Sequence, residues 1–227
     1  MRKTLRRACD EIGRFFYRLG GHIYRTPDEA RARPWFRDQG DSTLRLDYDL
    51  NADSLVVDVG GYLGQWSSDI FAMYGCTIHI FEPASFTASR LQHRFARNPK
   101  ILVHPCALAK ANGHAALNLC ADGSSLFKTA ATQESITLVE ADRFLREQGV
   151  ERIDLIKINI EGAEYDLLEH LIAAGWMARV VNLQVQFHDC VPDAAKRLAA
   201  IEVLLKETHD LTWRYPWVWE NWRRRDT

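Results

Sequence analysis

The chain has 227 residues, of which 47% are hydrophobic and 26% are charged, and its formal net charge is −1. A chain of this length and composition has ample apolar material for one core, which excludes disorder along its whole length. The near-zero net charge disfavours nucleic-acid binding, which usually requires a basic excess. Five scattered cysteines without a C-x-x-C pair indicate neither a disulfide framework nor a zinc site, so we expect a cytoplasmic protein.

Residues 1–25 combine seven arginine and lysine side chains with interleaved leucine, isoleucine and phenylalanine. This basic amphipathic pattern fits either peripheral contact with the inner face of a membrane or a helix docked on its own domain. Residues 26–54 are polar and contain two prolines, which predicts a connection. We therefore expect an N-terminal helix and linker over residues 1–40 and one domain over residues 41–227.

From residue 55 onward, short apolar runs alternate with helical patterns. This alternation predicts an α/β fold, a parallel sheet with helices on both faces. Residues 109–138 predict a small β excursion, and the aromatic-rich end of the chain predicts closing antiparallel strands. The expected strands span 55–59, 77–81, 101–104, 153–160 and 180–187, and the expected helices span 65–74, 85–96, 139–148, 163–173 and 193–206.

The stretch "VVDVGGYLGQW", residues 56–66, places an acid and three glycines directly after the first strand. Asp58 precedes Gly60, Gly61 and Gly64, and the first glycine of the dinucleotide fingerprint G-x-G-x-x-G is missing, which disfavours NAD. Glycines let the backbone approach a ligand closely, and an acid at this point suits a ligand that carries an ammonium group. A glycine-rich turn with a capping aspartate is the alternative.

The second strand ends in "IFEP", which places Glu82 at its carboxyl end. A carboxylate at this place in a nucleotide-binding sheet accepts the hydroxyls of a ribose. Asp58 and Glu82 together describe a ligand with an amino-acid moiety at one end and a ribose at the other. S-adenosylmethionine has this make-up.

The segment "DLIKINIEGAEYDLLEHL", residues 154–171, resembles the hallmark of the FkbM-type S-adenosylmethionine-dependent methyltransferases, whose usual form is close to DLIKIDIEGAE. The glycine loop, "FEP", "ALA", "GSSL" and "VEADRFL" follow in that family's order over residues 44–190. The resemblance implies a class I methyltransferase (Rossmann-like) fold with an antiparallel C-terminal strand. It also implies Ala107 beside the cofactor, Ser124 and Ser125 beside the substrate, and O-methylation of sugars, glycolipids or similar natural products.

Asn159 departs from the family, which commonly has aspartate at this position. An amide cannot take a proton as a carboxylate can, so Asn159 would orient the substrate hydroxyl or contact the cofactor. Glu161 is a titratable candidate for catalysis, although an acid there also simply favours the helix dipole.

The fifth strand ends in "LQVQFHD", which delivers Gln186 and His188 to the same rim. His188 is a candidate base because its ordinary pKa lies near neutrality, and Gln186 is a candidate substrate ligand. Lys157 lies within an apolar strand and needs a partner acid, for which Glu164 or Asp154 is expected.

An O-methyltransferase acting on a small-molecule or glycan acceptor is the reading that we favour. A non-catalytic module that keeps the cofactor fold and an NAD-dependent oxidoreductase are the alternatives. No set of residues has recognisable metal-ligand spacing, and the sequence does not predict an oligomeric state.

Overall fold

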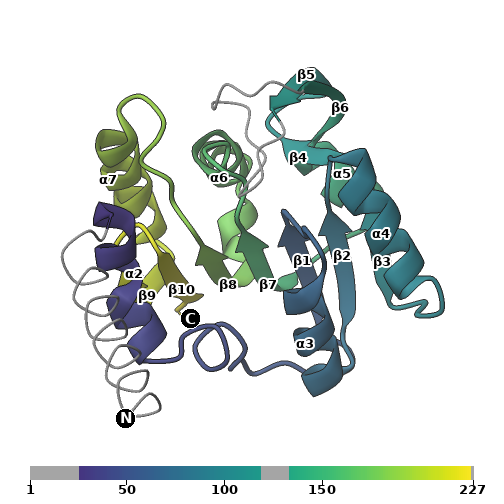
Figure 1. The fold of residues 1–227 in the computed structure, drawn as a ribbon, viewed down its shortest axis with the longest axis horizontal. Helices are drawn as coiled ribbons and strands as arrows, with labels where there is room; N and C mark the ends of the chain where they lie inside the picture. Colours follow the sequence, from purple (N-terminus) through teal and green to yellow (C-terminus); the bar gives the residue numbers. More distant parts are fainter. Residues whose placement is uncertain (1–25, 119–132, 226–227) are drawn as a thin grey trace, which may run out of the picture.

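The computed structural model describes residues 26–118 and 133–225, and a seven-stranded sheet forms its centre (Figure 1). Every neighbouring pair is parallel except the two pairs that the strand nearest the C-terminus makes. This arrangement confirms the predicted α/β class with an antiparallel C-terminal strand. In spatial order the strands are β3 (Ile101–His104), β2 (Thr77–Phe81), β1 (Leu55–Val59), β7 (Ile153–Ile158), β8 (Val180–Val185), β10 (Trp219–Arg224) and β9 (His209–Tyr215).

Helices cover both faces of this sheet because its strands are apolar on both sides. Val56 packs with the helices α3 (Gln65–Tyr74) and α4 (Ser85–Phe95), whereas Val57, on the opposite face, packs with the other group. That second group comprises α5 (Ala141–Glu147), α6 (Glu164–Ala173), the short 3-10 helix η1 (Trp176–Arg179) and α7 (Ala194–Leu205).

The first three strands and α3 have the predicted bounds, and the other predicted elements differ at their ends. β7 and β8 each end two residues earlier than expected, so that residues 159–160 and 186–187 belong to the loops at the carboxyl edge. Parallel strands bind ligands at this edge, and an apolar loop residue there is hard to distinguish from a strand residue.

The predicted β excursion is a separate three-stranded sheet. Its order is β4 (Ala107–Ala109), β6 (Gln133–Glu140), β5 (Gly113–Asn118), with β6 antiparallel to β5. β6 continues to residue 140, so α5 begins two residues later than predicted. Ser124 and Ser125 lie outside the described residues.

The prediction of a connection over residues 26–54 was wrong for its first part, which forms α2 (Pro27–Arg37). Thr26 and Glu29 form a reciprocal capping box, and Pro27 occupies the first turn. The buried Trp35 packs against Trp213 and Tyr215 of β9. The predicted helix over residues 1–25 lies outside the described part of the chain, and none of the described helices is long and apolar enough to span a membrane.

Candidate active site

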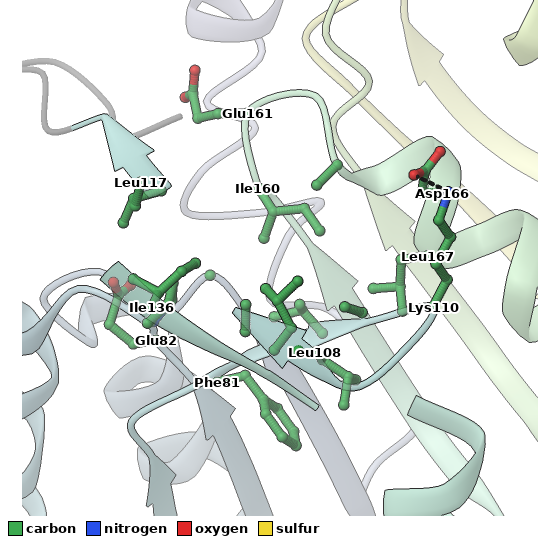
Figure 2. Close-up of a pocket in the computed structure, with 18 of the residues that line it drawn as sticks. Phe81, Glu82, Leu108, Lys110, Leu117, Ile136, Ile160, Glu161, Asp166 and Leu167 are labelled. Atoms are coloured by element: carbon green, nitrogen blue, oxygen red, sulfur yellow. Dashed lines mark ion pairs between the residues drawn. The ribbon is translucent and has the colours of Figure 1, made fainter. Parts of the chain in front are cut away.

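A cavity of about 660 Å³ lies at the carboxyl ends of β1, β2 and β7. One end is lined by Gly60, Glu82 and Asn159, and the small sheet and α6 supply mostly apolar walls. Figure 2 shows Glu82 and Ile136 at one side, and the ion pair of Lys110 with Asp166 at the other. Further apolar wall residues are Leu108, Leu117, Leu138, Ile160 and Leu167.

Three glycines of the first loop have different tasks. Gly60 has φ +88°, and a Cβ there would lie 2.0 Å from the carbonyl oxygen of Asn159, so only glycine lets the loop pack on the end of β7. A Cβ at Gly61 would meet Ile80 at 2.2 Å, and one at Gly64 would meet Leu91 at 2.5 Å. Gly60 lines the cavity, whereas the other two let the loop pack on β2 and α4.

Asp58 is paired with Lys157, so the expected pairing of this lysine with Glu164 or Asp154 was wrong. The two residues lie opposite each other on β1 and β7, and their Nζ–Oδ1 distance is 2.9 Å. Lys157 also donates to the Gly60 carbonyl at 2.7 Å, and the Ser67 hydroxyl donates to Asp58 Oδ2 at 2.6 Å.

The reason for this correction is the register of the sheet. A side chain within a strand meets its neighbour on the adjacent strand before it meets residues close in sequence, which here are Asp154 and Glu164. Both members of the pair are buried. Burial lowers the pKa of Lys157, and the adjacent Asp58 charge opposes this effect.

Glu82 lies at the end of the cavity and is held by the backbone around it. Its carboxylate accepts hydrogen bonds from the N–H groups of Tyr62 at 2.8 Å and Ala84 at 3.1 Å, and from the Thr87 hydroxyl at 2.9 Å. Burial raises the pKa of Glu82, and these hydrogen bonds lower it. A carboxylate has about four acceptor positions, so capacity remains for a ligand hydroxyl.

The residues at this end of the cavity fit S-adenosylmethionine. The side-chain oxygen of Asn159 is buried and has no hydrogen-bond partner within the described residues. Gly60 allows close approach of a ligand to the backbone, Glu82 offers a carboxylate for a ribose, and Ala107 lines the cavity. An ammonium, two hydroxyls and a flat base can each find a suitable neighbour among these groups.

His188 lies between two glutamates just behind the cavity. Its Nδ1 is 3.1 Å from Glu164 Oε1, and its Nε2 is 3.5 Å from Glu161 Oε1. Glu164 is fully buried, and its carboxylate also accepts hydrogen bonds from the backbone N–H groups of His188 and Gly162, each at 2.8 Å. Burial alone would lower the pKa of His188, but its hydrogen bonds to the two glutamates and their charges raise it to about 9.

The cavity brings together only part of the predicted set. Asn159, Glu161, Gly60, Glu82 and Ala107 line it, whereas Asp58, Gly61, Gly64, Gln186 and His188 do not. Among the described residues, no group of three or more histidine, cysteine or acidic side chains is placed to hold a metal ion.

Sequence reasoning missed the role of Glu164, which it offered only as a partner for Lys157. The sequence held no clear signal for this role, because Glu161 lies in the turn before α6 with a positive φ, and α6 begins only at Glu164. The long-range partner, His188, follows a different strand and could not be inferred from local spacing.

Comparisons with known proteins agree with this geometry. The sequence model of the methyltransferase FkbM domain matches residues 58–206. "Methyltransferase 1" from Beauveria bassiana (strain ARSEF 2860) is 25% identical over 177 residues, which is 66% of this chain and 71% of that protein.

Two solved structures are similar to this chain at low sequence identity. A protein of Clostridium thermocellum described as an rRNA-methylase has a TM-score of 0.52 at 9% identity, over 83% of this chain and 95% of that chain. M. capricolum TrmK, in complex with S-adenosyl-homocysteine, has a TM-score of 0.47 at 11% identity, over 84% of this chain and 69% of that chain. The first of these supports the class I methyltransferase fold alone. Since the matched domain spans more than half of the chain, the protein belongs to the FkbM family of S-adenosylmethionine-dependent methyltransferases.

Proposed function

We propose that the protein transfers the methyl group to a hydroxyl of a sugar, glycan, glycolipid or similar natural product. The observation that carries this proposal is the Glu161 carboxylate, which lines the cavity and faces His188. A hydroxyl must lose one proton when it is methylated, and a carboxylate at the cavity wall can accept that proton.

The protein's task is mainly alignment. S-adenosylmethionine supplies a methyl group already activated on a sulfonium. Gly60, Glu82 and Asn159 would hold this cofactor at one end of the cavity, and the remaining space would orient the acceptor in line. The walls from the small sheet and α6 would limit the access of water to the reacting groups.

In this proposal Glu161, and not His188, accepts the proton that the acceptor hydroxyl loses. A pKa of about 9 keeps His188 protonated at neutral pH, when it cannot act as a base. The imidazolium instead stabilises the Glu161 carboxylate 3.5 Å away, and the buried Glu164 holds the ring in place. His188 is therefore a positioning residue in this proposal.

The walls of the cavity suit an acceptor with an apolar face. Leu108, Leu117, Ile136 and Leu167 provide most of that surface, whereas Lys110 and Asp166 add charge at the far side. The C–H faces of a sugar or the aglycone of a glycoside fit such a wall. We expect no nucleic-acid acceptor, because the chain has no basic excess.

Methyl transfer from labelled S-adenosylmethionine to a panel of nucleotide sugars, oligosaccharides, glycolipids and an RNA transcript tests the proposal. We expect a sugar-containing acceptor to be methylated on oxygen, and Glu161→Gln to lower kcat at least about 100-fold. Glu161→Asp, which keeps the carboxylate, should retain more activity. Arg33→Gln on the exposed surface of α2 is the matched control and should leave kcat unchanged.

Three outcomes would contradict the proposal: methylation of RNA alone, methylation on nitrogen, or full activity of Glu161→Gln. Binding of S-adenosyl-homocysteine without transfer to any acceptor would favour the non-catalytic module instead. Calorimetry with NAD addresses the oxidoreductase, which the loop spacing already disfavours.

A further inference from the structure

An open groove with a basic lining lies on the exposed face of α4, outside the cavity of the candidate active site. Two arginines, a histidine, a serine and a leucine line it: Arg90, Arg94, His93, Ser89 and Leu63. No acidic residue is among these described residues, and the volume of the groove is about 600 Å³. Since one water molecule occupies roughly 30 Å³ in the liquid, the groove has room for a ligand larger than a simple ion.

The two arginines of the groove have no acidic partner within the described part of the chain. Arg90 is exposed, and the ring of Phe86 lies 5.6 Å from its guanidinium carbon. Arg94 donates to the Leu63 carbonyl at 2.7 Å and to the Gln65 side chain at 3.0 Å, which hold it in place without neutralising it. By contrast, both arginines of α5 pair with an acid four residues away on the same helix.

The helix dipole accounts for only part of this positive charge. A cation in the last turn of a helix is stabilised by the free carbonyl groups, which applies to His93 and Arg94. Arg90 lies one turn earlier, and α4 contains no acidic residue. Arg90 and Arg94 are four residues apart, a spacing at which like charges destabilise a helix. An anion bound between them would relieve that repulsion.

The chemistry of the lining suits a phosphate group. A guanidinium donates two parallel hydrogen bonds to phosphate oxygens, and the Ser89 hydroxyl adds a neutral donor. A diphosphate carries enough oxygens and charge to meet both Arg90 and Arg94, which a single carboxylate does not. Nucleic acids, in contrast, are bound by proteins that neutralise many phosphates along a backbone, and this chain has a net charge of −1.

We propose that this groove binds the phosphate or diphosphate group of a ligand, with Arg90 and Arg94 as its principal contacts. Leu63 belongs to the cofactor loop, which we define as residues 60–64 between β1 and α3, and it directly follows Tyr62, which lines the cavity. The groove therefore adjoins the candidate active site but shares none of its lining residues. The assignment does not depend on which acceptor the protein methylates.

Titration of the full chain with pyrophosphate, followed by NMR in about 0.15 M salt, tests this site. We expect the backbone amide signals of Leu63 and Ser89 to shift. Arg90→Gln should weaken pyrophosphate binding about 5- to 10-fold, and Arg90→Lys, which keeps the charge but not the planar fork, by a smaller factor. Binding of S-adenosyl-homocysteine should stay within about twofold in both variants, because Arg90 does not line the cavity.

Arg97→Gln and Arg33→Gln are the matched controls. Both arginines are exposed and form no ion pair within the described residues. Arg97 lies just beyond α4, whereas Arg33 lies on α2 at the opposite side of the large sheet (Figure 1). Each substitution should change pyrophosphate affinity by less than about twofold. Equal losses in Arg90→Gln and Arg97→Gln would indicate a diffuse attraction and overturn the assignment, as would the absence of pyrophosphate binding to the native protein.

Sedimentation with vesicles of phosphatidylcholine and phosphatidic acid, and binding of a single-stranded RNA, distinguish the possible sources of the phosphate. Loss of pyrophosphate binding alone in Arg90→Gln would support the groove and identify a soluble phosphorylated ligand. Loss of both pyrophosphate and vesicle binding would support it and identify a lipid headgroup. Loss of vesicle or RNA binding with pyrophosphate binding retained would overturn it, because Arg90 would then act as part of a macromolecular contact surface.

Discussion

His188 shows at the residue scale how two carboxylates can fix the charge of an imidazole. An ordinary histidine loses its proton near neutrality, which makes it a suitable base. Here Glu164 and Glu161 flank the ring on both sides, and the pKa of His188 is about 9. In the mechanism that we propose, this residue acts as a fixed cation and not as the base that the sequence suggested.

The raised pKa predicts that the protein loses stability in mildly alkaline solution. The folded-state pKa of His188, about 9, exceeds its unfolded value of 6.5, so the folded state binds the extra proton between these values. This contribution is complete below about pH 6.5 and is lost as the pH rises through 9. We expect the free energy of unfolding in urea to fall by up to about 3 kcal/mol over that range.

The control for this prediction is His188→Gln, whose unfolding free energy should vary less with pH between 6.5 and 9.5. Titration of the His188 ring by NMR gives an independent reading. A midpoint near 6.5, together with equal pH dependence in the native and variant proteins, would contradict the role that we assign to the two glutamates.

The loop between β1 and α3 is the structural element in which glycine identity matters most. Gly60 combines a positive φ with a Cβ position only 2.0 Å from the Asn159 carbonyl. Gly149 also has a positive φ, +65°, but a Cβ there would meet nothing within 4 Å. A substitution at Gly149 therefore adds only backbone strain, whereas one at Gly60 adds backbone strain and a steric clash.

We predict that Gly149→Ala lowers the free energy of unfolding by about 1 kcal/mol, the cost of a left-handed conformation for alanine. Gly60→Ala should lower it by about 2 kcal/mol or more, because the loop must also move away from β7. It should abolish calorimetric binding of S-adenosyl-homocysteine, which Gly149→Ala should retain. Similar unfolding free energies and similar affinities in the two variants would contradict this account.

The sheet and most helices could be predicted because their patterns are local. The strand over residues 55–59 is a mostly buried run that is apolar except for Asp58, and α3 ends before Gly75, whose positive φ stops the helix. The missed helix, α2, also had a local signal in Thr26 and Glu29, but its polar composition obscured it. Its single buried residue, Trp35, contacts β9 far away in the sequence.

The pairings within the site could not be predicted because they join distant strands and loops. Asp58 meets Lys157 only after β1 and β7 have become neighbours, and Glu164 meets His188 only after α6 has packed beside the end of β8. The sequence indicated which residue types gather at the carboxyl edge of the sheet. It did not indicate which carboxylate each cation would meet.

At the scale of the whole molecule, two separate groups of residues approach the same edge of the sheet. The cofactor end of the cavity is built from loops of the large sheet, and the apolar wall is built largely from the small sheet. α2 packs on the hairpin of β9 and β10, and Arg31 on α2 pairs with Asp189 next to His188 at 2.9 Å. The start of the described chain is thus joined to the rim of the site.

The basic sequence of residues 1–25 predicts binding to anionic vesicles. Each lysine or arginine near such a surface contributes about 1 kcal/mol, and salt screens this attraction. We expect the full chain to sediment with vesicles rich in phosphatidylserine at low salt, less at high salt, and not after deletion of residues 1–25. Binding that survives the deletion, or that salt leaves unchanged, would show that another part of the protein contacts the lipid.

The buried pair of Asp58 and Lys157 has a consequence for synthesis on the ribosome. The two residues are 99 positions apart, yet they occupy adjacent central strands. Before Lys157 has emerged from the ribosome, Asp58 lies on β1, and the edge of β1 that later pairs with β7 is open. Its carboxylate then needs water, which prevents burial of that edge. We therefore expect the first half of the domain to complete its folding only after β7 has emerged, because Lys157 then binds both Asp58 and the Gly60 carbonyl of the cofactor loop.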